Sequence, residues 1–296
     1  MRTIVLGSTG QLGQDLMKAF GDGTTGITHQ DLDVADGVAV AKTLYALKPD
    51  CVVNTAAFHR VDDCEVNPGL AFAVNALGAR NVAHASAEIG ALVVFLSTDY
   101  VFGGQHRARG NPYREPDQPQ PLNTYGVSKA AGERLTMQAN PRHLVVRSSG
   151  LYGTATSRKG WTFPELMLQK ARTEPIIRVV DDQVLSPTFT ADLAAKVKQL
   201  VERDATGVFH VTNGGECSWF EFAQSVFEMT GTVANVEAVS SSTMRTRAQR
   251  PPYSAMASER LAGIGIEPLR SWRDALREYL CLKRVAAVAH AGGART

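Results

Sequence analysis

The amino-acid sequence predicts an α/β fold built on a doubly wound parallel sheet, with a smaller, discontinuous α/β domain beside it. In the first half of the chain, short apolar segments alternate with segments in which apolar residues recur at the helical period. A glycine-rich turn at residues 7–13 follows the first apolar segment directly. Residues 92–97 form a nearly continuous apolar run, which is typical of a strand buried on both faces of a parallel sheet.

The elements of the first half follow from this alternation. Strands are expected where β-branched and apolar residues concentrate, at residues 2–6, 26–29, 51–54, 92–97 and 143–147. Helices are expected where apolar residues recur every three or four positions, at residues 11–20, 38–47, 71–89 and 125–138. Pro49 and Asp50 end the second of these helices.

The second half is less regular. A strand is expected at residues 207–211, and helices are expected at residues 163–172, 191–202, 218–230 and 272–282. Ser218, followed three residues later by Glu221, is typical of a capping box. The segment 283–296 is rich in Ala and Gly and is predicted to be a disordered tail.

Composition excludes several classes of protein. With 44% hydrophobic and 20% charged residues, the 296-residue chain is globular, as one large domain or two closely packed ones. A net charge of +2 without a basic block predicts no nucleic-acid partner, and no run of about 20 apolar residues predicts a membrane span. The four cysteines are scattered without metal-binding spacing, which predicts no metal site and a reducing, cytoplasmic location.

The turn after the first strand has the spacing G-x-x-G-x-x-G, with Gly7, Gly10 and Gly13. Glycines let the backbone approach a pyrophosphate, and the N-terminus of the following helix supplies free N–H groups, as in Rossmann-type dinucleotide-binding folds. Asp31 and Asp33 follow about 20 residues later, where a carboxylate can meet a ribose. Asp31 could equally be a solvated loop acid. No acid stands at the tip of the second strand, so both NAD and NADP remain open.

Two further segments carry residues suited to carbonyl reduction. Tyr125 and Lys129 are spaced i and i+4, so on a helix they share one face. Lys129 would stabilise a tyrosinate and lower the pKa of Tyr125, which gives its proton to a carbonyl oxygen as hydride arrives at the carbon. Ser97, Thr98 and Asp99 end the apolar strand at residues 92–97, at the sheet edge where α/β proteins bind ligands. Taken singly, each segment also has a purely structural interpretation. The first could be a half-buried tyrosine beside a surface lysine, and the second a hydroxyl that caps a loop.

Together these residues resemble the extended short-chain dehydrogenases/reductases, and further strings narrow the resemblance to the dTDP-4-dehydrorhamnose reductase family. The strings that carry it are N-T-A-A-F at residues 54–58, S-T-D-Y-V-F at 97–102, P-L-N-T-Y-G at 121–126, D-Q-V-L-S-P-T at 182–188 and R-P-P-Y-S at 250–254. The likeness covers residues 1 to about 280.

The resemblance implies reduction of the C4 ketone of dTDP-4-dehydro-L-rhamnose to dTDP-L-rhamnose by NADPH or NADH. The implied catalytic residues are Thr98, Tyr125 and Lys129. The implied cofactor-binding residues are Gly7, Gly10, Gln11, Leu12, Gly13, Asp33, Val34, Ala56, Ala57, Phe58, Tyr125 and Lys129. The implied substrate-binding residues are Thr98, Asp99, Tyr100 and Arg250, the last facing the diphosphate.

The same resemblance divides the chain into two parts. Residues 1–148, with a returning segment near 184–212, would bind NAD(P), and residues 149–183 and 213–282 would bind the nucleotide sugar. The nucleotide-sugar substrate is the expected partner, and a homodimer and a metal at a subunit contact are left open.

Two departures from the family pattern fall in the substrate half. Gly150 stands where the family has a tryptophan, and Thr162 stands where it has an asparagine. Trp161 could replace the lost ring. The alternatives are therefore a reductase or epimerase for a different nucleotide sugar, or a non-catalytic NADP-binding regulatory subunit. The presence of both Tyr125 and Lys129 argues against the regulatory subunit.

Overall fold

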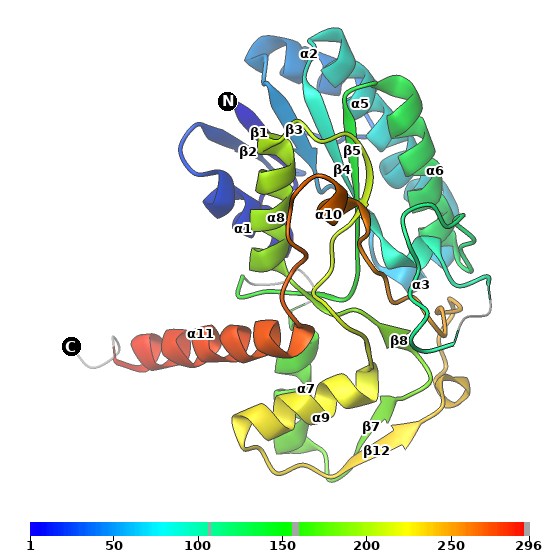
Figure 1. The fold of residues 1–296 in the computed structure, drawn as a ribbon, viewed down its shortest axis with the longest axis vertical. Coiled ribbons are helices and arrows are strands. Elements are labelled where there is room, and N and C mark those ends of the chain that lie inside the picture. The colour runs from blue at the N-terminus through cyan, green and yellow to red at the C-terminus, as the bar shows by residue number, and fades with distance from the viewer. Residues whose placement is uncertain (106–107, 156–159, 293–296) are drawn as a thin grey trace.

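The structure, a computed structural model, describes residues 1–105, 108–155 and 160–292 and contains the predicted doubly wound sheet (Figure 1). Six parallel strands lie in the order β10-β5-β4-β3-β1-β2. They are β1 (Thr3–Leu6), β2 (Thr24–Ile27), β3 (Cys51–Asn54), β4 (Leu92–Thr98), β5 (His143–Ser148) and β10 (Gly207–His210). All seven residues of β4 are buried, as its apolar run predicted. The fold prediction is confirmed.

Helices cover both faces of this sheet. On one face α1 (Gln11–Phe20) and α8 (Thr190–Glu202) share an apolar core with the central strands. On the other face lie α2 (Gly37–Leu47), α5 (Ala79–Glu88) and α6 (Thr124–Ala139) (Figure 1). Strand β2 begins and ends two residues before its predicted position, because Thr28 already belongs to a turn closed by Asp31.

The helix predicted over residues 71–89 is interrupted. It consists of α4 (Pro68–Phe72), a π-helical segment η1 (Ala73–Gly78) and α5, and it follows an unpredicted short helix, α3 (Val61–Val66). Helix α6 passes so close to η1 that a Cβ on Gly132 would lie 2.1 Å from the carbonyl oxygen of Asn75. The π-helical segment therefore sits at a tight helix–helix crossing.

The second half forms a smaller group of elements below the sheet in Figure 1. Strands β7 (Ile177–Val180) and β12 (Val236–Val239) pair in parallel, and α7 (Phe163–Thr173) and α9 (Trp219–Thr230) share a core with them. The remaining elements are short: η2 (Asp99–Val101), β6 (Leu151–Tyr152), β8 (Val184–Leu185), β9 (Thr188–Phe189), β11 (Cys217–Ser218), η3 (Ser241–Thr243) and α10 (Arg260–Gly263). The predicted capping box of α9 is confirmed.

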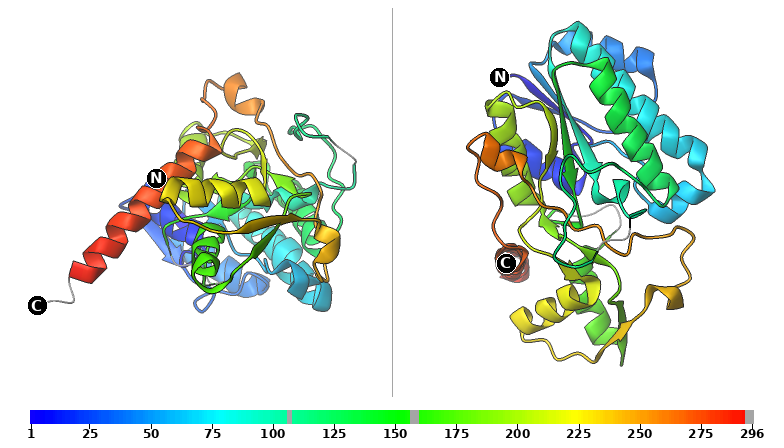
Figure 2. Two further views of the ribbon diagram at one scale, coloured as in Figure 1. Left: turned by 90° about the horizontal axis from the view of Figure 1, so that it is seen from below. Right: turned by 45° about the vertical axis from the view of Figure 1, so that its right-hand side comes forward.

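The last helix, α11 (Trp272–Gly292), extends away from the rest of the chain (Figure 2). It continues ten residues past Leu282, where the sequence predicted a disordered tail from residue 283. Alanine, the best helix former, is frequent in this stretch, so residues 283–292 are helical and the prediction of disorder is wrong for them. Residues 293–296 lie outside the described part. Among the described helices, none combines the length and the apolar character that a bilayer crossing requires.

Candidate active site

The glycine-rich turn joins β1 to α1 and is built from close backbone contacts. Gly7 adopts a φ of +80°, and a Cβ on it would lie 2.6 Å from the Thr55 hydroxyl oxygen. A Cβ on Gly13 would lie 2.3 Å from the carbonyl oxygen of Gly7. Gly13 thus lets the helix pack against the turn, and Gly7 keeps the turn open in front of it.

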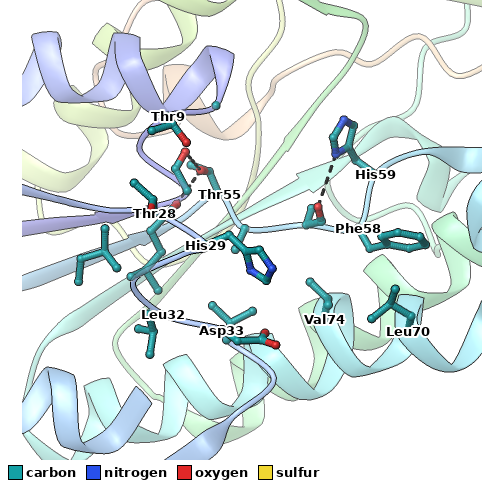
Figure 3. A pocket seen from close by; sticks show the side chains of 17 residues that line it. Thr9, Thr28, His29, Leu32, Asp33, Thr55, Phe58, His59, Leu70 and Val74 are labelled. Atoms are coloured by element: carbon teal, nitrogen blue, oxygen red, sulfur yellow. Dashed lines mark hydrogen bonds between the residues drawn. The ribbon is translucent and has the colours of Figure 1, made fainter. Parts of the chain in front are cut away.

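A cavity of about 350 Å³ lies over this turn at the carboxyl ends of the first strands (Figure 3). Seven of the predicted cofactor-binding residues line it: Gly7, Gly10, Asp33, Val34, Ala56, Ala57 and Phe58. Lining residues that the sequence did not predict include Thr9, Thr28, His29, Thr55, His59 and Leu70. The glycine cradle, the N-terminus of α1 and the apolar walls fit a dinucleotide.

Three predicted cofactor residues face elsewhere. The Gln11 side-chain amide donates to the carbonyl oxygens of Gly153 (3.3 Å) and Ala155 (3.2 Å), so it ties α1 to the second half of the chain. Leu12 is buried in the core under the sheet, and Gly13 packs on Gly7. These residues therefore shape the turn, and their contact with a cofactor stays a prediction.

The structure separates the two candidate acids after β2. Asp31 accepts hydrogen bonds from the amide and hydroxyl of Thr28, at 2.9 and 2.7 Å, and so closes the turn. Asp33 lines the cavity with His29 (Figure 3). Asp33 is thus the carboxylate beside the candidate ribose site, and a histidine stands at the tip of the strand.

The three predicted catalytic residues come together where β4 ends against α6. The Thr98 hydroxyl oxygen accepts from the amide of Tyr100 at 3.2 Å, and the Thr98 hydroxyl lies near the Tyr125 phenol and lowers its pKa. A Cβ on Gly126 would lie 2.1 Å from the carbonyl oxygen of Tyr100, so only glycine allows α6 to approach η2, the turn that follows β4, this closely. Lys129 lies one turn further along α6.

The protonation of this site differs from the prediction. Lys129 donates to the carbonyl oxygen of Leu96 at 2.6 Å, and burial raises the pKa of Tyr125, although the nearby Thr98 hydroxyl opposes the rise. The expected lowering of the Tyr125 pKa by Lys129 is wrong in this structure. A phenol with a raised pKa remains protonated at neutral pH, which suits a proton donor.

Burial lowers the pKa of Lys129 to about 7, although the nearby Glu133 carboxylate opposes the shift. Between this value and the ordinary pKa of 10.5, the unfolded chain binds more protons than the folded chain, so the free energy of unfolding rises with pH. We expect Lys129→Met to remove a rise of about 1 kcal/mol per pH unit in that window. Urea unfolding of both proteins at neutral and alkaline pH measures this, and parallel pH dependences would contradict it.

Beneath Lys129 lies a buried ion pair. Arg147, 4% exposed, donates to both carboxylate oxygens of Glu133, 1% exposed, at 2.9 and 2.7 Å, and Ser97 donates to the same carboxylate at 2.5 Å. Arg147 also contacts His210, whose pKa is lowered to about 4 by burial and by the Arg147 charge. The pair connects α6 to β5 directly below the catalytic residues.

Of the predicted substrate-binding residues, Asp99 points its carboxylate into the protein. Its side chain is 3% exposed, and its oxygens accept from the hydroxyls of Thr98, Ser149 and Ser254. These hydroxyls compensate the burial of the carboxylate. A direct contact between Asp99 and the substrate stays a prediction.

Tyr100 and Arg250 lie together beside the site. The Tyr100 ring packs edge-on against Tyr125, with 5.9 Å between ring centres, and the Arg250 guanidinium lies near the Tyr100 phenol, which helps to raise the pKa of Arg250. The Arg250 guanidinium also donates to both carboxylate oxygens of Asp62, at 3.1 and 2.6 Å, which holds the pKa of Asp62 well below its usual range. A contact between Arg250 and a diphosphate stays a prediction.

The departures from the family pattern have structural explanations. Gly150 has a φ of +53°, and a Cβ there would lie 2.6 Å from Leu185, so this backbone does not accommodate a tryptophan. The Thr162 hydroxyl belongs to the capping box of α7 and hydrogen-bonds Tyr279. Trp161 is 53% exposed, and its replacement of the missing ring stays a prediction.

Sequence reasoning missed two residues that support the site. Asn75, on the π-helical segment, hydrogen-bonds the amide and carbonyl of Phe58 and donates to the Ser128 hydroxyl. Glu65 accepts from the amide and hydroxyl of Thr124 at the start of α6. Neither contact has a local sequence signal, because each partner comes from a distant segment.

Comparisons with known proteins agree with this geometry. A family model described as the RmlD substrate binding domain matches residues 1–285. The spore coat polysaccharide biosynthesis protein SpsK of Bacillus subtilis is 39% identical over 94% of this chain and 96% of its own. The dTDP-4-dehydrorhamnose reductase of Streptomyces griseus is 38% identical over 94% of this chain and 92% of its own.

A solved structure extends the agreement to the fold. The dTDP-4-dehydrorhamnose reductase of Bacillus anthracis, crystallised in complex with NADP, matches with a TM-score of 0.89 at 36% identity, over 95% of this chain and 98% of its own. The resemblance seen in the sequence motifs is confirmed: this chain belongs to the dTDP-4-dehydrorhamnose reductase family.

Proposed function

We propose that this protein reduces the C4 ketone of dTDP-4-dehydro-L-rhamnose to give dTDP-L-rhamnose, with NADPH as the reductant. The observation that carries the proposal is the Thr98 hydroxyl beside the protonated phenol of Tyr125 at the carboxyl end of β4, on the same sheet edge as the glycine turn. The Streptomyces griseus and Bacillus anthracis relatives bear the name of this activity, and the latter binds NADP.

Different residues would hold the cofactor and donate the proton. Gly7 and Gly10 would hold the pyrophosphate, and Asp33 would meet the adenosine ribose. When bound, NADPH supplies the hydride for the C4 carbon. Tyr125 donates its proton to the ketone oxygen, and Thr98 binds that oxygen. Lys129 would bind the nicotinamide ribose.

We also propose that the two groups of elements have separate tasks. The sheet, formed by residues 1–148 and the returning segment near 184–212, binds the cofactor, and residues 149–183 and 213–282 bind the nucleotide sugar. The four thiols form no disulfide, which supports a reducing, cytoplasmic setting. Assembly as a homodimer stays a prediction.

The test is an assay of NADPH oxidation with purified protein and dTDP-4-dehydro-L-rhamnose. We expect loss of reduced nicotinamide in proportion to the dTDP-L-rhamnose formed. A parallel assay with NADH measures the preference between the two cofactors. Cofactor binding without turnover of this substrate would exclude the proposed reaction.

A second candidate is the same reduction on another nucleotide-linked 4-keto sugar. Gly150 favours it, because the residue that replaces a family tryptophan changes the wall of the candidate sugar site. A panel of dTDP- and UDP-linked 4-keto sugars, compared by kcat/KM, separates the two candidates.

A further inference from the structure

The Asp99 carboxylate lies next to the catalytic hydroxyl but points into the protein. Its neighbours come from three segments: Thr98 at the end of β4, Ser149 after β5, and Ser254 in the R-P-P-Y-S string. The three hydroxyl oxygens lie 3.1, 2.8 and 2.6 Å from the carboxylate oxygens. A carboxyl group surrounded by hydroxyls can exist as a carboxylate that accepts three hydrogen bonds or as a neutral acid that donates one.

Thr98 can make only three hydrogen bonds, because a hydroxyl offers one proton and two lone pairs. One lone pair accepts from the Tyr100 amide. If Asp99 is ionised, it can only accept, so the Thr98 proton is directed to Asp99. Thr98 then has no proton free for a substrate oxygen.

If Asp99 is neutral, the same geometry gives the opposite result. The Asp99 acid then donates to the second lone pair of Thr98. The Thr98 proton is free to point at a ketone oxygen, beside the phenol of Tyr125. The neutral form holds one more proton than the ionised form, taken up from solvent, and the direction of the hydrogen bond between Thr98 and Asp99 is reversed.

The surroundings of the Asp99 side chain favour its neutral form. Burial raises the pKa of Asp99, although the hydroxyls of Ser254, Ser149 and Thr98 oppose the rise. The titratable groups that face it are the phenols of Tyr100 and Tyr125, both with raised pKa values. The nearby cations are engaged elsewhere: Lys129 on the Leu96 carbonyl, Arg250 on Asp62 and Arg147 on Glu133.

We propose that Asp99 is a positioning residue whose neutral form turns the Thr98 hydroxyl toward the substrate ketone and whose ionised form turns it away. This inference rests on the proposed reductase function. It assigns to Asp99 an indirect role through Thr98 in place of the direct substrate contact predicted from the sequence.

The test is the pH dependence of kcat at saturating NADPH and substrate. In the wild type we expect kcat to fall as pH rises through the pKa of Asp99. In Asp99→Asn the side chain cannot ionise, and the inflection is expected to disappear. Ser254→Ala and Ser149→Ala each remove a donor that stabilises the carboxylate, so each should move the inflection upward by about one pH unit. These two variants keep the proposal testable if Asp99→Asn does not fold.

Asp15→Asn is the matched control. Asp15 is 5% exposed and accepts from the Thr190 hydroxyl at 2.6 Å, on the α1–α8 side of the sheet, so the same substitution there should leave the pH profile unchanged. A flat wild-type profile, an inflection that persists in Asp99→Asn, or an inflection that neither serine variant moves would overturn the proposal.

A second readout does not depend on turnover. Infrared titration of the ligand-free protein should show a carboxylic-acid C=O band at a pH where ordinary aspartates are ionised, and Asp99→Asn should lack it. The band with no reduction of any sugar would reject the proposed function and leave the Asp99 arrangement standing. Turnover without the band would reject the role of Asp99 alone.

Discussion

Tyr125→Phe is expected to lower kcat by about 10²–10⁴-fold while the affinity for NADPH is retained, because the substitution removes only the proton donor. The phenol ring stays in place against Tyr100, and Tyr125 is not among the residues that line the cavity described over the glycine turn. Steady-state assays give kcat, and quenching of protein fluorescence by NADPH gives the dissociation constant.

Tyr152→Phe provides the control for this experiment. The Tyr152 hydroxyl is buried without a hydrogen-bond partner among the described residues, in the core next to Phe189, so its removal should leave kcat unchanged. A Tyr125→Phe variant with a kcat near that of Tyr152→Phe would show that another group donates the proton.

Arg147→Met is expected to lower the free energy of unfolding by about 3–5 kcal/mol, because it leaves the Glu133 carboxylate buried without its partner. The remaining Ser97 hydroxyl cannot replace two bonds from a guanidinium. Chemical denaturation at neutral pH measures the loss of unfolding free energy. A lower Tm of the variant in a thermal melt gives an independent check.

The double variant Glu133→Met with Arg147→Met should recover part of this stability, since an apolar pair carries no uncompensated charge. Arg178→Met is the surface control: Arg178 and Glu237 form an exposed pair between β7 and β12, whose loss should cost less than about 1 kcal/mol. Equal effects of the two arginine substitutions would contradict the importance of the buried pair.

The sequence predicted those elements whose signals are local. The apolar run of β4 marks a strand buried on both faces, and the i, i+4 spacing of Tyr125 and Lys129 holds on α6. The glycine turn was predictable for the same reason, since its tight backbone contacts exclude side chains.

Features that depend on a distant partner could not be predicted. The strands β7 and β12 pair across more than 50 residues of chain, and the π-helical segment lies where Gly132 of α6 closely approaches Asn75. The orientation of Asp99 depends on Ser149 and Ser254, which no spacing rule connects to it. The pKa of Lys129 likewise reflects burial that a sequence does not display.

The position of β10 at the edge of the sheet has a consequence for synthesis of the chain. β10 covers β5, pairing Gly207 with Leu144 and His210 with Arg147, yet it is translated only after β6 to β9. Until then the apolar β5 presents an unpaired edge, which is a template for aggregation. A nascent chain therefore passes through a vulnerable interval on the ribosome, and a fragment that stops at residue 148 would remain in that state permanently.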